Sequence, residues 1–167
     1  MSERDERQTL WAPWRIEYIA GPREEGCIFC NRLAATDDRK NLILARGSKS
    51  FAMMNKFPYN NGHLMVAPIR HTADFAGLTS DEVLEIFTFL KQFTEVFHRT
   101  MKPHGFNVGL NLGRTAGAGV EDHLHVHLVP RWDGDTNFMP VIGGVKVISE
   151  HVQSTYDKLL EVYRTLE

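Results

Sequence analysis

The sequence predicts an α+β domain, an antiparallel sheet of about five strands with two main helices. Short apolar runs separated by turn-forming residues cluster in the first half of the chain, and one strongly periodic helical segment follows them. Strands and helices that are segregated in this way, rather than alternating, are typical of the α+β class. The 167 residues, 43% hydrophobic and 24% charged, have the size and composition of one ordinary globular domain.

Residues 1–26 are expected to form an irregular N-terminal arm ahead of a domain that spans residues 27–167. The arm is polar at first and then aromatic around Trp11, Trp14 and Tyr18. Large aromatic side chains contribute most when they are buried, so we expect these three to pack on the body of the domain or on a second subunit.

The first strands are expected in three short apolar runs, over residues 41–46, 51–55 and 63–68. Gly47-Ser48 separates the first two runs, and Pro58-Tyr59-Asn60-Asn61-Gly62 separates the second from the third. Gly, Pro, Asn and Ser are the residues that turns require. Because connections this short cannot cross over a sheet, the three strands should be antiparallel neighbours.

The clearest helix signal begins at Thr79, where Thr79 and Glu82 fit a capping box. Apolar residues then recur at three- and four-residue spacing up to a stop near Pro103, which predicts one buried stripe. Its expected members are Val83, Ile86, Phe87, Leu90, Phe93 and Phe97. Two further strands are expected over residues 106–111 and 123–130, and a final helix from about residue 149 to 166.

The charge pattern limits the classes of partner. The formal net charge is -2 with both signs interspersed, so no basic stripe offers a surface to polymeric nucleic acid, although a free nucleotide stays open. The charged N-terminus precedes no signal-like apolar segment and no run of about 18 apolar residues occurs, so we expect a cytoplasmic protein without a membrane partner. Two cysteines are too few for a disulfide-framed secreted domain.

Three histidines alternate with apolar residues at His123, His125 and His127. In a strand, residues two apart share a face at a spacing of roughly 6.6–6.8 Å, so the three imidazoles would line one surface while the intervening apolar residues face the core. Imidazole can act as base, acid, nucleophile or metal ligand near neutral pH. The upstream loop 111–119 is rich in small residues, and its backbone N–H groups could bind an anion. Together these features indicate a nucleotide site.

The run His123-Leu124-His125-Val126-His127-Leu128-Val129 resembles the signature of the histidine triad (HIT) superfamily of nucleotide hydrolases and transferases. Residues 55–68 are similar to the nucleoside-binding segment of that family, and most of residues 27–132 follow its pattern. This resemblance implies a HIT-like fold. Residues 11–15, 105–113 and 130–138 are most similar to the branch that includes bacterial diadenosine tetraphosphate phosphorylases.

The resemblance implies a chemical role for three histidines. His125, in the middle of the triad, would attack the α-phosphorus through a neutral imidazole and form a covalent nucleotidyl-histidine. His127 would donate to phosphate oxygens or to the bridging oxygen, and His63 would support the triad by hydrogen bonding. A plain structural role stays open for both His127 and His63.

The resemblance also implies nucleotide contacts from three side chains. Asn55 would bind the ribose hydroxyls, Asn111 the transferred phosphate, and Trp132 a second nucleoside by stacking. A turn-capping Asn55 and a packing Trp132 are the alternatives.

Backbone N–H groups of the loop Gly117-Ala118-Gly119 are expected to stabilise charge that develops on the phosphate. Many family members carry a Ser or Gln side chain at or beside the position of Gly119, whereas Ala118 and Gly119 offer only backbone. This sequence therefore departs from the family pattern at the residues expected to contact the leaving group.

Cys27 and Cys30 form a C-x-x-C motif, which by itself is half of a zinc site, a reduced redox pair or a disulfide. In HIT members with this motif, the remaining zinc ligands resemble His71 and His123. A Cys₂His₂ set is a closed tetrahedral site suited to a structural zinc ion. On this interpretation His123 is structural and His125 catalytic.

These expectations lead to an enzyme that cleaves dinucleoside polyphosphates such as diadenosine tetraphosphate at the α-phosphate, with inorganic phosphate as the preferred acceptor. Hydrolysis by water, cleavage of nucleoside phosphoramidates, and a non-catalytic nucleotide-binding or scaffold protein are the alternatives. The family resemblance further implies a homodimer or a higher homo-oligomer.

Overall fold

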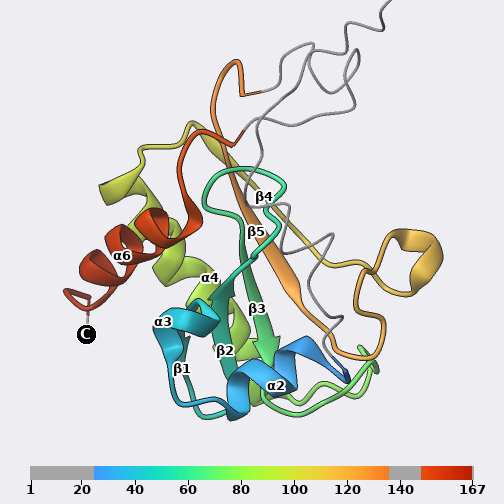
Figure 1. Cartoon of the computed structure of the whole chain (residues 1–167). Coiled ribbons are helices and arrows are strands. Elements are labelled where there is room, and N and C mark those ends of the chain that lie inside the picture. The colour runs from blue at the N-terminus through green and yellow to red at the C-terminus, as the bar shows by residue number, and fades with distance from the viewer. Residues whose placement is uncertain (1–24, 136–147, 167) are drawn as a thin grey trace, which may run out of the picture.

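The computed structural model describes residues 25–135 and 148–166, which form a five-stranded antiparallel sheet with helices on both of its faces (Figure 1). The strand order is β1-β2-β3-β5-β4. The α+β class with its antiparallel sheet is confirmed. The strands are β1 (Ile43–Arg46), β2 (Ser50–Met54), β3 (Leu64–Pro68), β4 (Gly105–Gly109) and β5 (Val126–Arg131). The helices are α2 (Ile28–Ala34), α3 (Asp38–Asn41), α4 (Ser80–Thr100) and α6 (Val152–Tyr163), with a short 3₁₀ turn η1 (Arg114–Ala116).

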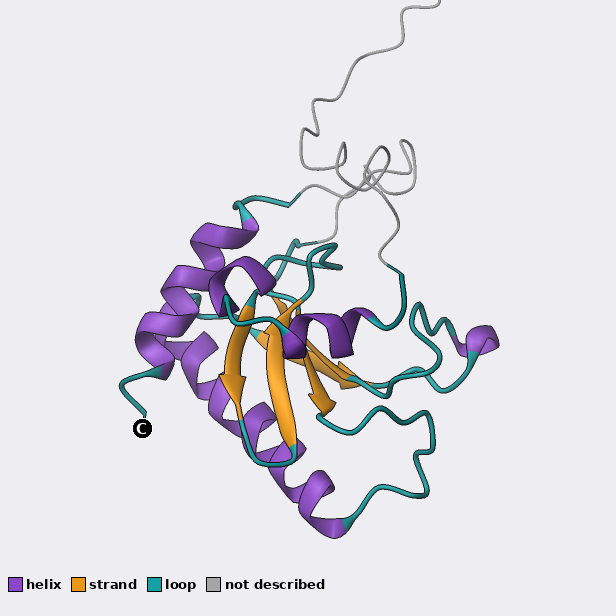
Figure 2. Ribbon diagram, turned by 60° about the horizontal axis from the view of Figure 1, so that its bottom comes forward, coloured by secondary structure: helices purple, strands orange, loops and turns teal. Residues whose placement is uncertain are grey.

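The two faces of the sheet carry separate cores. One face, which includes Leu64 and Leu128, packs against the long helices α4 and α6, which lie together on one side of the sheet (Figure 2). The opposite face, which includes Phe51 and Met65, packs against Phe29 of α2. Strand residues alternate between these faces, as the pleat requires. His127 pairs with Met65 across β3 and β5, and so it belongs to the face that α2 covers.

The buried stripe of α4 differs from the expected one at two positions. Ile86, Leu90, Phe93 and Phe97 are buried as predicted, but Val83 is 39% exposed and Phe87 is 62% exposed, so their assignment to the stripe was wrong. Phe89 and Val96 are buried in their place. With 3.6 residues per turn, Phe87 lies about 100° round the helix from Ile86 and therefore points away from the sheet.

The histidine strand is also shorter than expected. β5 begins at Val126, so His123 and His125 precede it in an irregular segment rather than within the ladder. The segment is held elsewhere, because the N–H of Leu124 donates to the carbonyl of Thr72 at 2.8 Å. The expected row of three imidazoles in one strand is therefore wrong in its backbone, although all three rings are buried.

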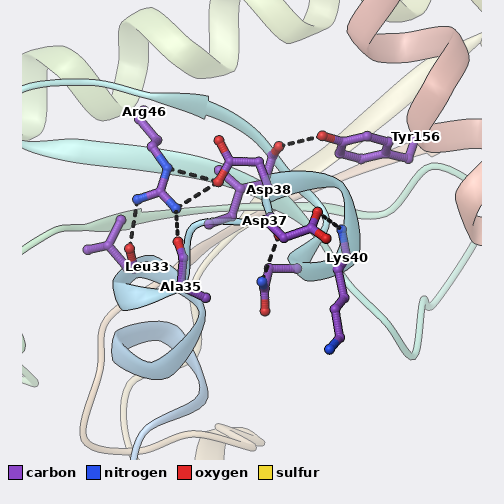
Figure 3. Close-up of polar contacts among 9 residues, drawn as sticks. Leu33, Ala35, Asp37, Asp38, Lys40, Arg46 and Tyr156 are labelled. Carbon is purple, nitrogen blue, oxygen red and sulfur yellow. Dashed lines mark hydrogen bonds and ion pairs between the residues drawn. The ribbon is translucent and has the colours of Figure 1, made fainter.

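Helices α2 and α3 were not foreseen, because elements of seven and four residues are too short to show a period. Arg46, at the end of β1, links both helices to the sheet through hydrogen bonds. Its guanidinium donates to the carbonyls of Leu33 and Ala35 and to the carboxylate of Asp38, at 2.7 to 3.0 Å (Figure 3). On the other side of β1, the Tyr156 hydroxyl of α6 donates to the carbonyl of Ile43 at 2.9 Å.

The capping box at the start of α4 is confirmed. Thr79 Oγ1 accepts from the N–H of Glu82, and the Glu82 carboxylate accepts from the N–H of Thr79. Arg70 donates twice to the same carboxylate, at 3.1 and 3.0 Å. These hydrogen bonds, with that of Arg70 the strongest cause, lower the pKa of Glu82 to about 2. The network holds the segment that follows β3 and thereby the position of His71.

Two expectations lie partly or wholly outside the described residues. Residues 1–24, the part of the expected arm over residues 1–26 that holds Trp11, Trp14 and Tyr18, are not described. Residues 136–147, where the segment 130–138 that resembles the phosphorylase branch ends, are not described either. Among the residues that are described, no helix has the length and apolar character that spanning a membrane requires.

Candidate active site and metal centre

The predicted site histidines meet on the α2 side of the sheet. His127 lies in β5 between Met65 of β3 and Gly109 of β4. The ring centroid of His125 lies 4.8 Å from that of His127, and the Phe29 ring packs on His125 at 4.8 Å. Both imidazoles are buried. Residues 29 and 125 are thus neighbours although the sequence separates them widely.

The protonation of His125 follows from its partner. His125 Nδ1 lies 2.9 Å from the carbonyl oxygen of His123, and a carbonyl oxygen only accepts, so Nδ1 carries the proton. In the neutral ring, Nε2 then carries the lone pair. Burial lowers the pKa of His125, while its hydrogen bond to the His123 carbonyl acts in the opposite direction. A buried neutral imidazole with a free Nε2 is what nucleophilic attack on phosphorus requires.

Two hydrogen bonds in series determine the tautomers of the other two histidines. The backbone N–H of Tyr59 donates to His63 Nδ1 at 3.0 Å, so the proton of His63 is on Nε2. That nitrogen lies 2.9 Å from His127 Nδ1, which therefore accepts. The remaining proton of a neutral His127 is on Nε2.

His127 Nε2 is buried and has no hydrogen-bond partner among the described residues. Burial first, and then the charge of His125, lower the pKa of His127 to about 4, so the ring is neutral at pH 7. An unpartnered buried donor costs free energy unless a ligand accepts from it. The arrangement places a neutral N–H donor beside the nucleophilic nitrogen of His125.

Asn55 is part of the turn that leads to His63. Its Oδ1 accepts from the N–H of Phe57 at 2.9 Å, and its Nδ2 lies 3.3 Å from His63 Nδ1. The turn-capping alternative therefore describes its contacts in this structure. Ribose binding by Asn55 stays a prediction.

The expected phosphate loop is exposed and irregular. Asn111 Nδ2 donates to the carbonyl of Gly117 at 3.4 Å, which brings these two predicted residues together. Gly117 has φ +91°, a left-handed conformation that side chains resist. Ala118 is buried and Gly119 exposed, and the N–H groups of Gly117 and Ala118 donate within the loop to the carbonyls of Arg114 and Gly113 at 2.9 and 3.3 Å. Donation from this loop to phosphate stays a prediction.

Trp132 follows β5 and is half-buried. Its indole N–H donates to the carbonyl of Met101 at 3.2 Å, which fixes the ring against the end of α4. This contact matches the packing alternative, and stacking on a nucleoside stays a prediction.

The four predicted metal ligands converge. Cys27 Sγ lies 3.3 Å from His123 Nδ1, and Cys30 Sγ lies 3.3 Å from His71 Nδ1 and 3.6 Å from His123 Nδ1. The two histidine Nδ1 atoms are 3.3 Å apart, and all four ligand atoms lie within 4.8 Å of one another. His123 Nε2 donates to the carbonyl of Pro68 at 2.8 Å, which leaves Nδ1 unprotonated and aimed at the cluster.

The four individual separations, of 3.3 to 3.6 Å, fit a tetrahedral zinc ion. Zn–S bonds of about 2.3 Å and Zn–N bonds of about 2.0–2.1 Å at tetrahedral angles separate the ligand atoms by roughly 3.3 to 3.8 Å. Both cysteines are free thiols in this structure rather than a disulfide. A backbone carbonyl that orients each metal-bound imidazole is the usual second partner of such a ligand, and Pro68 supplies it here.

Sequence analysis missed Asp135, which joins the site to the end of β5. Its largely buried carboxylate accepts from Arg131 at 2.6 and 2.7 Å, from Asn60 Nδ2 at 2.8 Å and from the N–H of Trp132 at 3.1 Å. Asn60 in turn accepts from the N–H of His63 at 3.1 Å. A partner 75 residues away gives no signal in the sequence.

Comparisons with known proteins place the chain among relatives of described function. A family model described as "HIT domain" matches residues 37–134. The chain is 40% identical over 163 residues to a Mycobacterium tuberculosis protein named AP-4-A phosphorylase, covering 93% of this chain and 84% of that protein. It is 30% identical over 114 residues to the adenosine 5′-monophosphoramidase of Candida albicans, covering 66% of this chain and 73% of that protein.

Solved structures show the same fold. A hypothetical histidine triad nucleotide-binding protein from Sulfolobus tokodaii superposes with a TM-score of 0.62 at 27% identity, covering 83% of this chain and 90% of that chain. A Zn-bound histidine triad family protein from Mycobacterium smegmatis superposes with a TM-score of 0.66 at 20% identity, covering 84% and 94% of the two chains.

Proposed function

This chain belongs to the histidine triad (HIT) family, and on that premise we propose that it is an enzyme that cleaves dinucleoside polyphosphates, such as diadenosine tetraphosphate, at the α-phosphate. The observation that carries the proposal is the pairing of a nucleophilic nitrogen with a proton donor. Because Nδ1 of His125 donates to a carbonyl, His125 Nε2 carries the lone pair. Because Nδ1 of His127 accepts from His63, His127 Nε2 carries the proton and is a buried donor. The relative named AP-4-A phosphorylase supports the class of substrate.

The reaction runs in two displacements. His125 Nε2 attacks the α-phosphorus and forms a P–N bond, while the bond to the bridging oxygen breaks and the polyphosphate leaves as an anion that accepts a hydrogen bond from His127 Nε2. The nucleotidylated His125 keeps its Nδ1 proton and carries a positive charge. In the second step an oxygen of inorganic phosphate attacks the same phosphorus, the P–N bond breaks and His125 is released as the neutral ring, while the proton of the phosphate stays on the product. Diadenosine tetraphosphate and phosphate then give ATP and ADP. A buried pair of neutral imidazoles suits both steps, because neither ring must lose a proton to react.

Four further sites complete the proposed nucleotide contacts. We assign the ribose to Asn55, the transferred phosphate to Asn111 and a second nucleoside to Trp132. The backbone N–H of Gly119 would donate to phosphate oxygens, and those of Gly117 and Ala118 would do so by exchanging their present bonds to the Arg114 and Gly113 carbonyls. Ala118 lacks the hydroxyl of many family members, and a charge-assisted hydrogen bond contributes about 1.5–3 kcal/mol, so the backbone carries more of this task here.

Cys27, Cys30, His71 and His123 are proposed to hold one structural zinc ion. The convergence of two thiols and two Nδ1 atoms, of which that of His123 is unprotonated, within 4.8 Å of one another supports this assignment. All four positions are filled by protein, so the ion would stabilise the fold and take no part in the chemistry.

Product identity tests the proposed function. The purified chain is incubated with diadenosine tetraphosphate in phosphate-containing and phosphate-free buffer, and the products are separated by chromatography. We expect ADP and ATP at a rate that rises with phosphate. AMP and ATP at a phosphate-independent rate would assign hydrolysis and contradict phosphorolysis. Cleavage of adenosine 5′-phosphoramidate alone would favour the activity named for the Candida relative, and no cleavage of either compound would favour a non-catalytic binding protein.

The subunit arrangement is a separate proposal, that of a homodimer or a higher homo-oligomer. β4 is an edge strand, and its flank carries exposed apolar side chains, with Val108 53% and Leu112 48% exposed. An uncovered edge with apolar neighbours is a pairing surface that proteins normally protect. Light scattering at micromolar concentration is expected to give at least twice the chain mass. A monomer mass would reject the proposal.

A further inference from the structure

Tyr59 packs against the rings of His63 and His127, the two histidines that are joined by a hydrogen bond. The centroid of its ring is 4.5 Å from that of His63 and 5.5 Å from that of His127, with interplanar angles of 35° and 39°. The backbone N–H of the same residue donates to His63 Nδ1. The ring itself is 51% exposed, so one side contacts the imidazoles while the other meets solvent.

The turn that carries Tyr59 is anchored on both sides. The next residue, Asn60, is buried and donates from Nδ2 to the Pro130 carbonyl at 3.0 Å and to the Asp135 carboxylate at 2.8 Å. At its other end the turn is tied by the N–H of Asn55, which donates to the carbonyl of His63 at 2.9 Å. A ring presented by so constrained a turn is preorganised, and it does not have to be ordered when substrate binds.

The hydrogen bond between His63 Nε2 and His127 Nδ1 depends on the exclusion of water. Each imidazole has two nitrogens that water could protonate or deprotonate, and only one pair of tautomers leaves the proton on His127 Nε2. Among the described residues, Asn55 lies beside His63, the imidazole of His125 lies beside His127, and the Tyr59 ring packs on both imidazoles. Of these three, Tyr59 is the one that contacts both rings and is itself half exposed.

We propose that Tyr59 is a positioning residue of the reaction, whose ring shields the His63–His127 hydrogen bond from water and holds both imidazoles in the tautomers that keep the donor on His127 Nε2. This rests on the proposed function only for its effect on rate. The tautomers themselves are a property of the protein without substrate, so they can be measured independently of activity.

The test compares Tyr59→Ala with two other variants. Tyr59→Phe keeps the ring and loses the hydroxyl. Phe75→Ala removes an aromatic ring with the same exposed fraction, 51%, from the segment between β3 and α4. Because Tyr59 and Phe75 are both half exposed, both alanine variants should fold. Long-range ¹H–¹⁵N correlation spectra of histidine-labelled protein report the tautomer and the titration of each imidazole, and steady-state kinetics give kcat and KM.

In Tyr59→Ala we expect mixed tautomers at His63 and His127 and a rise in the pKa of the pair, since hydration favours the charged form. The acidic limb of the rate profile should then move to higher pH, and kcat should fall about tenfold or more with KM changed less than about threefold. Tyr59→Phe and Phe75→Ala should stay within about twofold of the parent chain in kcat and keep its spectra.

Unchanged tautomers and titration in Tyr59→Ala would overturn the proposal, whatever the rate. A rise in KM with kcat intact would also overturn it and assign the ring to substrate binding instead. If the parent chain cleaves no dinucleoside polyphosphate, the proposed function fails, while the spectra still decide whether Tyr59 controls the imidazole pair.

Discussion

Replacing His125 by Ala is expected to slow the cleavage of diadenosine tetraphosphate by about ten-thousand-fold or more. The nucleophile opens the two-step route, and removal of one member of a catalytic group that acts as a unit abolishes the contribution of the whole group. His125 is buried against Phe29, so Ala also leaves a small cavity, and His125→Gln provides a variant of closer volume. Both variants should retain the thermal transition within several degrees while losing turnover.

The control is His98→Ala, which removes an exposed histidine on α4 that packs edge-on against Phe106. Its rate should stay within about twofold of the parent chain. Quenching the parent chain during turnover with an alkaline denaturant, which preserves the acid-labile P–N bond, should trap a nucleotidyl adduct on the peptide that contains His125, and the His125 variants should give none. A His125→Ala protein that retains a near-normal rate would reject the covalent mechanism. Phosphate or water would then attack the α-phosphorus directly.

Features encoded within a few residues could be predicted from the sequence. The capping box needs only Thr79 and Glu82, and the antiparallel order of β1, β2 and β3 follows from their short connections. The start of β5 could not be read in the same way. His123-Leu124-His125 alternates like a strand, but the N–H of Leu124 donates to the carbonyl of Thr72, and the His123 side chain lies beside Cys27 at the start of α2. A pattern of polarity does not reveal which partner the backbone will find.

The histidines of the candidate site could be predicted from the sequence, but their protonation states could not. Residue type indicated that His125 and His127 belong to one site, but the location of each proton depends on contacts from distant residues. The His123 carbonyl orients His125 locally, whereas His127 takes its tautomer from His63, which is 64 residues away and is itself set by Tyr59. The four proposed metal ligands likewise span 96 residues between Cys27 and His123. Such tertiary contacts were accessible from the sequence only through family resemblance.

Removal of one metal ligand is expected to destabilise the chain more than it slows the reaction. Parent protein purified without added metal should contain close to one equivalent of zinc, and Cys27→Ser should contain far less. A ligand that binds only the folded state at about a thousand times its dissociation constant contributes about 4 kcal/mol. For a chain of this size each kcal/mol changes the melting temperature by about 2–4 °C, so the midpoint should fall by about 10 °C. A chelator should lower the midpoint of the parent by a similar amount and leave Cys27→Ser unchanged.

The rate per folded molecule should change less than about threefold in Cys27→Ser, because other bonds hold the carbonyl that orients the nucleophile. His123 Nε2 still donates to the Pro68 carbonyl, and the N–H of Leu124 still donates to the carbonyl of Thr72 at 2.8 Å. The backbone at His123 therefore keeps its position, and His125 Nδ1 keeps its acceptor. Titration of the folded fraction with a tight-binding nucleotide normalises the rates. Absence of zinc from protein with both cysteines reduced would refute the metal site, and a rate loss as large as that of His125→Ala would show that the cluster acts in the reaction itself.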